Sequence, residues 1–112
     1  MNTKKKRILI DLDGVLNTYN GNFDECVIPP IKKGAKTFLK ELYKNYELYI
    51  YTTRNLLLTA KWLIENNIDK YFKEITSVKI PAFLFLDDRA LNFKGDYKTT
   101  LKEIYLFKTY WN

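Results

Sequence analysis

Short apolar runs alternate with amphipathic stretches along the chain. Residues 7–13, with the sequence RILIDLD, form a continuous aliphatic run that ends in carboxylates, which is typical of a short buried strand. Gly14 follows directly and is expected to end this strand. Similar apolar or β-rich runs predict further strands at 47–53, 73–76, 83–86 and 103–107.

Apolar positions spaced three and four residues apart predict a helix over residues 31–46, with lysines on its opposite face. Pro30, just before this segment, suits the start of a helix. The same spacing predicts a second helix over 55–66, for which Asn66 and Asn67 suit a C-terminal cap.

Strands that alternate with helices in this way imply parallel βαβ units. The expected fold is therefore a three-layer α/β domain with a Rossmann-like parallel sheet. Residues 98–102 predict a short additional helix, and residues 15–30 and 92–96 predict loops, the first with room for a small hairpin. A chain of 112 residues is the size of one domain, so residues 1–112 are expected to form a single unit.

Composition limits the chemistry that the chain can perform. Apolar residues make up 46% of the sequence, which is enough for one core. Cys26 is the only cysteine and there is no histidine, which excludes an internal disulfide, a Ser-His-Asp triad, a Cys-His dyad and every histidine-based metal site. An enzyme built on this chain must use carboxylates, hydroxyls, lysines and a hard cation.

The sequence lacks the patterns of a membrane or exported protein. No run approaches the roughly 18 apolar residues that a membrane-spanning helix needs. The aliphatic residues 8–10, which follow the basic N-terminus, are too few for the hydrophobic region of a signal peptide. We therefore expect no membrane association and a cytoplasmic location.

The net charge of +6 comes mainly from lysine, with one cluster at residues 4–7 (KKKR). Such a cluster suits binding of a nucleic acid or another polyanion. The alternative is a solvated, frayed terminus. The small number of arginines, three, favours this alternative, because specific readers of nucleic acid usually carry more.

Polar, potentially reactive residues directly follow three of the predicted strands: Asp11-Leu12-Asp13, Thr52-Thr53-Arg54 and Asp87-Asp88-Arg89. In an open parallel sheet, ligands bind at the carboxyl ends of the strands, where the strand order reverses. If the strand at 7–13 lies between those at 47–53 and 83–86, all three clusters meet in one crevice. A single aspartate at such a place is often only a helix cap or a strand end. Three clusters together indicate a Mg²⁺ site, because this hard cation offsets the repulsion between crowded carboxylates.

These segments resemble the motifs of the haloacid dehalogenase superfamily. ILIDLDGVLN is similar to its first motif, LYIYTTR to its second, and FLFLDDR to its fourth, while Lys79 stands where the third-motif lysine belongs. The resemblance covers almost the whole chain in the right order. It differs from a response-regulator receiver domain, in which the acidic pair comes first.

The resemblance implies a Mg²⁺-dependent phosphatase. Asp11 would attack phosphorus and form an aspartyl phosphate. Asp13 would act as general acid and base. The metal would be held by the Asp11 carboxylate, the Asp13 main-chain carbonyl and the acidic pair, Asp87 and Asp88. Lys79 would offset the charge that the phosphate shares with the nucleophile.

The second motif implies the contacts to the substrate phosphate. Thr52 would bond a phosphate oxygen, and Thr53 is the alternative hydroxyl. Arg54 either touches the phosphate or forms a surface salt bridge near the start of the following helix. Arg89 is expected to orient the acidic pair.

The spacing between the motifs leaves no room for a cap domain, which larger relatives carry. An open crevice excludes water poorly and selects little among small substrates. The resemblance therefore implies an exposed phosphate on a large substrate, such as a nucleic-acid end, or an oligomer in which a neighbour covers the site. The loop at 15–30 and residues 93–96 are the expected rim. Two alternatives stay open: a phosphotransferase, and a binding module for nucleic acid or another polyanion that has lost turnover.

Overall fold

A parallel sheet with β1 at its centre organises the fold. The computed structural model describes residues 5–19, 21, 23–87, 91–92 and 96–111, with the backbone alone described at 87, 91–92 and 106–111. Within these residues the strand order is β3-β2-β1-β4-β5, and every pairing is parallel. The strands are β1 (Lys6–Asp11), β2 (Tyr46–Tyr51), β3 (Phe72–Thr76), β4 (Leu84–Asp87) and the short β5 (Leu91–Asn92). The first four confirm predicted strands.

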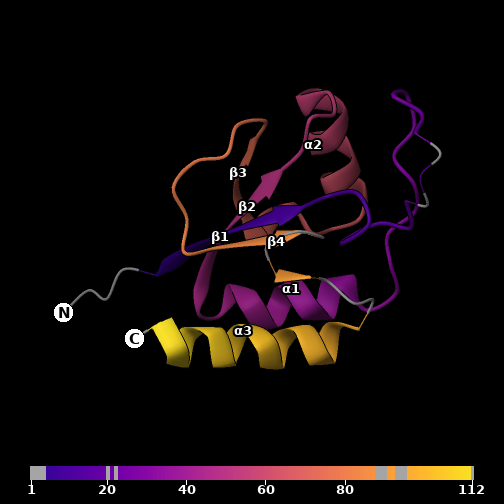
Figure 1. Ribbon diagram of the computed structural model, residues 1–112. Helices are drawn as coiled ribbons and strands as arrows, with labels where there is room; N and C mark the ends of the chain where they lie inside the picture. The colour runs from indigo at the N-terminus through magenta and orange to yellow at the C-terminus, as the bar shows by residue number, and fades with distance from the viewer. Residues whose placement is uncertain (1–4, 20, 22, 88–90, 93–95, 112) are drawn as a thin grey trace.

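Helices cover both faces of this sheet (Figure 1). The helix α1 (Ala35–Tyr43) and the helix α3 (Tyr97–Trp111) lie side by side on one face, while α2 (Leu56–Glu65) lies on the other. A short 3₁₀ helix, η1 (Asp69–Tyr71), precedes β3. The predicted three-layer α/β fold with a parallel sheet is therefore confirmed. Among the described helices, none has both the length and the apolar character needed to cross a membrane.

The aliphatic run of β1 forms the centre of the hydrophobic core. Ile8, Leu9 and Ile10 are at most 1% exposed, because β2 and β4 flank β1 and both faces of the sheet are covered. A strand buried in this way needs apolar side chains at successive positions, which explains the absence of polar alternation. The buried side chains that pack in the same core come from every layer and include Phe38, Leu39, Leu48, Ile50, Leu63, Ile68, Leu84, Leu86 and Ile104.

The helix α2 follows its prediction closely. Asn55 caps its start, because the Asn55 side chain accepts a hydrogen bond from the Leu58 amide at 3.0 Å. Asn66 stands at the C-cap, and Asn67 adopts a φ of 56°, a left-handed conformation that asparagine tolerates better than most residues. The predicted asparagine cap is therefore confirmed.

The helix α1 begins at Ala35, later than predicted, because the chain before it pairs with the loop that follows β1. Ile31 forms an antiparallel bridge with Asn17, which closes this loop at its base. An extended residue at this position cannot join the helix, so Pro30 does not start it. The helix also ends at Tyr43, before the predicted end, because the chain soon enters β2.

The helices α1 and α3 approach each other closely at Gly34. This residue stands at the N-cap of α1 with a φ of 89°, and a Cβ atom here would lie 3.2 Å from the ring of Tyr97. The Tyr97 ring stacks on Phe38 of α1, with centroids 4.7 Å apart. Its hydroxyl donates a hydrogen bond to the Val15 carbonyl at 2.6 Å. Tyr97 thus fastens α3 both to α1 and to the loop after β1.

The predicted strand at 103–107 is wrong, because these residues continue α3. Asp96 stabilises the start of α3, because its carboxylate accepts a hydrogen bond from Thr99 Oγ1 at 2.6 Å. This bond is the main cause that holds the pKa of Asp96 below its usual value. Thr100 and Ile104, four residues apart, are both buried. The sequence EIYLF at residues 103–107 has high strand propensity, but tertiary packing overrides this propensity and the residues form a helix.

We expect Tyr97→Phe to lower the free energy of unfolding by about 1–2 kcal/mol at neutral pH, because the buried Val15 carbonyl loses its partner.

Burial also raises the pKa of the Tyr97 phenol. The unfolded chain therefore loses this proton first, and wild-type stability should fall as the pH rises above about 10. Urea unfolding at neutral pH and at about pH 10.5 should show a smaller fall for Tyr97→Phe than for wild type. Tyr105→Phe, at an exposed position of α3, is the control. Parallel falls in wild type and Tyr97→Phe would contradict this expectation.

Candidate active site

The ends of three strands meet at the carboxyl edge of the sheet. Asp11 is the last residue of β1, and Thr52 directly follows β2. Ile10 of β1 pairs in register with Leu86 of β4, so Asp11 and Asp87 occupy the next positions on neighbouring strands. The strand β1 lies between β2 and β4, which meets the condition set out from the sequence and brings the three backbone segments to one edge.

A tight turn after β1 holds the Asp13 carboxylate through Asn17. The Asn17 side chain is fully buried. Its oxygen accepts hydrogen bonds from the amides of Gly14 at 3.1 Å and Tyr19 at 3.0 Å, and its Nδ2 donates to Asp13 Oδ1 at 2.9 Å. From the sequence, Asn17 is predicted only to lie in the loop at 15–30. The available signal is the tendency of asparagine to bond nearby backbone groups in a turn, here four residues after an aspartate.

Arg54 holds the same carboxylate from the opposite cluster. Its Nε donates to both Asp13 oxygens, each at 3.0 Å. The Arg54 side chain is only 1% exposed, whereas that of Asp13 is 22% exposed. The sequence left open that Arg54 forms a surface salt bridge. Arg54 does form an ion pair, but the arginine is buried, so the expected surface location is wrong. A buried guanidinium needs its partner, since an unpaired charge in the interior is costly.

The Arg54 guanidinium also binds the loop that rises beyond β1. Its Nη1 donates to the main-chain carbonyls of Asp24 at 2.8 Å and Val27 at 3.2 Å. The guanidinium carbon lies 4.5 Å from the centroid of the Phe23 ring. We call residues 23–27 the rim segment. The Nη2 atom of Arg54 is buried and has no hydrogen-bond partner among the described residues, so its N–H groups are unused donors.

The two candidate threonines differ in their surroundings. Thr52 is buried and Thr53 is exposed. The Thr52 hydroxyl accepts a hydrogen bond from the Arg54 amide at 3.1 Å, and the Thr52 amide donates to the Thr76 carbonyl at 3.0 Å. These contacts fix Thr52 at the edge beside Asp11, while its hydroxyl proton can still be donated.

Lys79 approaches the face of the sheet that carries Asp11. Its Nζ lies 5.7 Å from the ring centroid of Tyr51 and 5.3 Å from that of Phe85. Tyr51 pairs in register with Asp11, and Phe85 pairs with Leu9, so all four side chains project to one side of the sheet. Lys79 is exposed and belongs to the connection between β3 and β4, so its ammonium group places a positive charge on this face of the sheet.

Comparisons with known proteins bear on the fold. No protein-family model matches the chain, and no curated protein matches it. A solved structure of a conserved protein from Bacteroides thetaiotaomicron is similar, with a TM-score of 0.69 and 21% sequence identity over 90% of both chains. That likeness shows the fold. A second structure, an uncharacterized protein from Listeria monocytogenes serotype 4b, matches with a TM-score of 0.47 and 20% identity, over 88% of this chain and 60% of that one.

The acidic pair expected to complete a metal site falls at the limit of the described residues. Asp88, Arg89 and the expected rim residues 93–95 lie outside them, and only the backbone of Asp87 is described. Among the side chains that are described, no group of three or more Asp, Glu, His or Cys is arranged to hold a metal ion. The carboxylate and carbonyl oxygens at this edge are hard donors of the kind that Mg²⁺ prefers. The ligand set stays a prediction, because Asp88 and the side chain of Asp87 lie outside the described residues.

The basic run at 4–7 is not simply a frayed terminus. Lys6 and Arg7 belong to β1 and are partly buried. Lys6 Nζ lies 4.6 Å from the ring centroid of Phe83, and Arg7 Nη1 donates to the Pro81 carbonyl at 3.1 Å. The expectation of a solvated terminus is therefore wrong for these two residues, which pack along the connection into β4. Lys4 lies outside the described residues.

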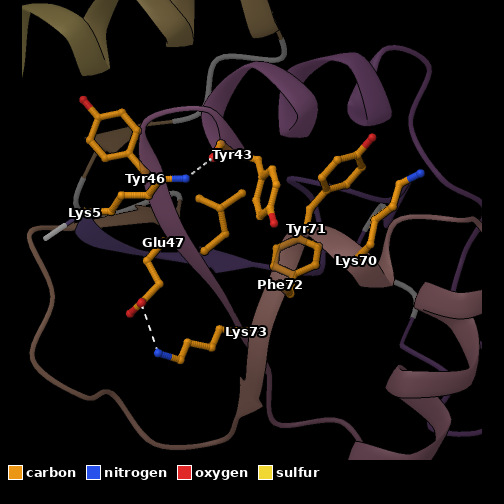
Figure 2. Close-up of a pocket in the computed structure, with 9 residues that line it drawn as sticks. Lys5, Tyr43, Tyr46, Glu47, Lys70, Tyr71, Phe72 and Lys73 are labelled. Carbon is orange, nitrogen blue, oxygen red and sulfur yellow. Dashed lines mark hydrogen bonds and ion pairs between the residues drawn. The ribbon is translucent and has the colours of Figure 1, made fainter. Parts of the chain in front are cut away.

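A cavity of about 300 Å³ lies at the opposite end of the sheet, where β1, β2 and β3 begin (Figure 2). Its lining includes several basic and aromatic side chains: Lys5, Tyr43, Tyr46, Lys70, Tyr71, Phe72 and Lys73. Figure 2 shows that the lysines do not converge. Lys5 Nζ donates to the Tyr43 carbonyl at 3.0 Å, and Lys73 Nζ pairs with Glu47 at 3.2 Å. Because these ammonium groups already have protein partners, the carboxyl edge is the better candidate for chemistry.

Proposed function

We propose that the protein is a Mg²⁺-dependent phosphomonoester hydrolase of the haloacid dehalogenase-like kind, with Asp11 as nucleophile. One observation carries this proposal: Asp11, Thr52 and the Asp13–Arg54 pair gather at one edge of a parallel sheet, where the strand order reverses. A nucleophile, a general acid and a hydroxyl donor are the groups that phosphoryl transfer through an enzyme ester requires. The motif resemblance supports the same assignment.

The proposed reaction has two displacements at phosphorus. An Asp11 oxygen attacks phosphorus in line, and the bond to the ester oxygen breaks as Asp13 donates its proton to that oxygen. Asp13 then accepts a proton from a water molecule, whose oxygen attacks the same phosphorus. Inorganic phosphate leaves, Asp11 regains its carboxylate, and Asp13 is protonated for the next cycle.

Positive charge and hydrogen-bond donors at the edge support this chemistry. Thr52 would donate its hydroxyl proton to a phosphate oxygen, and Lys79 would offset the charge on the phosphate. The Asp11 carboxylate, the Asp13 main-chain carbonyl and the Asp87-Asp88 pair would hold Mg²⁺, which when bound supplies positive charge to the phosphate oxygens.

The segment between β1 and α1 leaves the carboxyl edge of the sheet open, which supports the proposal of an exposed phosphate as substrate. Its described residues contain a turn and a loop but no helix or sheet that would cover the edge. An exposed phosphate on a large substrate, such as a nucleic-acid end, suits this openness and the net charge of +6. We infer that the reaction takes place in the cytoplasm, which the single cysteine also suits.

A phosphate-release screen tests the proposal. Wild-type protein is incubated with aryl phosphates, metabolite phosphates and oligonucleotides phosphorylated at the 3′ or 5′ end. We expect turnover of at least one class with Mg²⁺, loss of turnover with EDTA, and recovery when excess Mg²⁺ is added. No release across the panel, from protein that circular dichroism shows to be folded, would contradict the proposal. Transfer of phosphate to an added alcohol rather than water would identify a phosphotransferase instead.

A further inference from the structure

We infer that Arg54 is a positioning residue. Its guanidinium couples the orientation of the general acid Asp13 to the position of the rim segment 23–27. This inference rests on the proposed function, because it assigns a partner to the proposed acid. Its basis is the buried Arg54 guanidinium, whose hydrogen bonds to described residues run to these two places.

The contacts of Asp13 define where its carboxylate can point. Oδ1 accepts from both Asn17 Nδ2 and Arg54 Nε, while Oδ2 accepts from Arg54 Nε. Arg54 is almost fully enclosed and Asp13 is partly exposed, so the carboxylate is the end of the pair that faces outward. Arg54 therefore fixes the orientation of the acid without itself occupying the exposed position.

The rim segment depends on the same guanidinium. Phe23 is 56% exposed, and Val27 is also exposed, so these side chains have little protein around them. Within the segment, the Val27 amide donates to the Asp24 carbonyl at a long 3.3 Å, and the Cys26 amide donates to the Asp24 side chain at 2.9 Å. The bonds from Arg54 Nη1 and the contact with the Phe23 ring attach this segment to the rest of the protein.

A direct phosphate contact by Arg54 would have a different kinetic signature. A group that binds the transferring phosphoryl group acts on every substrate, because all esters share that group. A group that positions the general acid matters most when the leaving oxygen needs a proton. An alkyl phosphate releases a strongly basic oxygen, whereas 4-nitrophenyl phosphate releases an oxygen that can depart without a proton.

The kinetic test compares these two substrates in wild type and Arg54→Lys with Mg²⁺ present. Lysine keeps the charge but cannot make the forked contacts to Asp13 and the rim at once. We expect kcat for the alkyl phosphate to fall by about 10²-fold or more, and kcat for 4-nitrophenyl phosphate to fall by less than about 10-fold, with little change in KM. Adding guanidinium chloride at low concentration to Arg54→Ala should restore part of the alkyl phosphatase activity.

Phe23→Ala tests the link to the rim from the other side. Without the ring, the guanidinium loses one wall of its site. The ratio of aryl to alkyl turnover should therefore rise in the same direction as in Arg54→Lys, by a few-fold. Leu57→Ala is the matched control, because Leu57 is 68% exposed on α2 and makes none of the hydrogen bonds or ring contacts described above for the Arg54 side chain. It should leave the ratio unchanged.

Hydrogen exchange tests the coupling without any need for turnover. In Asp13→Asn, the carboxylate that anchors Arg54 is replaced by a neutral amide, so the amides of Cys26 and Val27 should exchange faster while those of α2 stay unchanged. Unchanged exchange in the rim segment would overturn the inference. Equal losses of activity on both esters in Arg54→Lys would also overturn it, in favour of a phosphate contact. Wild-type protein that hydrolyses neither ester, but shows the exchange coupling, would contradict only the proposed function.

Discussion

Asp11→Asn is expected to abolish Mg²⁺-dependent phosphate release, with a loss on the order of 10⁴-fold or more in kcat. The amide of asparagine has nearly the shape of the carboxylate but cannot form the acyl phosphate on which the proposed mechanism depends. Asp11 lies at the end of β1 and outside the apolar core, so the substitution should leave the fold intact. Initial rates of phosphate release at saturating Mg²⁺ measure the effect.

The control for this change is Asp69→Asn, which makes the same chemical substitution at the exposed start of η1. It should keep the wild-type rate within about twofold, because surface substitutions away from a site have small effects. A residual rate above about a tenth of wild type in Asp11→Asn would contradict a nucleophilic role for Asp11. Circular dichroism and urea unfolding of both variants separate loss of chemistry from loss of structure.

Phe38→Ala is expected to lower the free energy of unfolding by about 3–5 kcal/mol. The Phe38 side chain is 1% exposed, and its ring stacks on Tyr97 of α3 at an interplanar angle of 25°. Truncation removes buried apolar surface, leaves a cavity between α1 and the sheet, and takes away the surface on which α3 rests. Urea unfolding, with the m-value reported beside the midpoint, measures the loss.

Phe23→Ala supplies the matched control, because it deletes the same side chain at an exposed position. Its cost should stay below about 1 kcal/mol. Phe38→Leu, which keeps most of the buried volume, should lie between the two variants. Similar losses for Phe38→Ala and Phe23→Ala would contradict the assignment of Phe38 to the core.

The central strand and its catalytic candidates are readable from local patterns. A run such as RILIDLD carries apolar side chains at successive positions, and only a strand with both faces covered needs them. The carboxylates that end the run must leave the core, so Asp11 and Asp13 fall at the edge of the sheet. The caps of α2 are readable for the same reason, because Asn55 and Asn66 act on backbone groups a few residues away.

The sequence-based predictions of secondary structure are wrong where contacts between distant segments override local preference. Ile31 is held extended by Asn17, so the predicted helix begins only at Ala35. The residues EIYLF at 103–107 have high strand propensity, but they continue the helix α3, in which Ile104 is buried in the core. Neither outcome can be read from a short window, because the contact that decides each one joins segments far apart in the chain.

The amino-acid sequence is sufficient to indicate the fold class, the aliphatic centre of the sheet and the set of polar residues at its carboxyl edge. These features follow from periodicity, and periodicity is a property of neighbouring residues. The contacts of the Arg54 side chain depend on the tertiary structure alone. Its partners Asp13, Asp24 and Val27 lie between 27 and 41 positions away in the sequence, and its burial becomes favourable only when the folded chain brings their oxygens around one guanidinium.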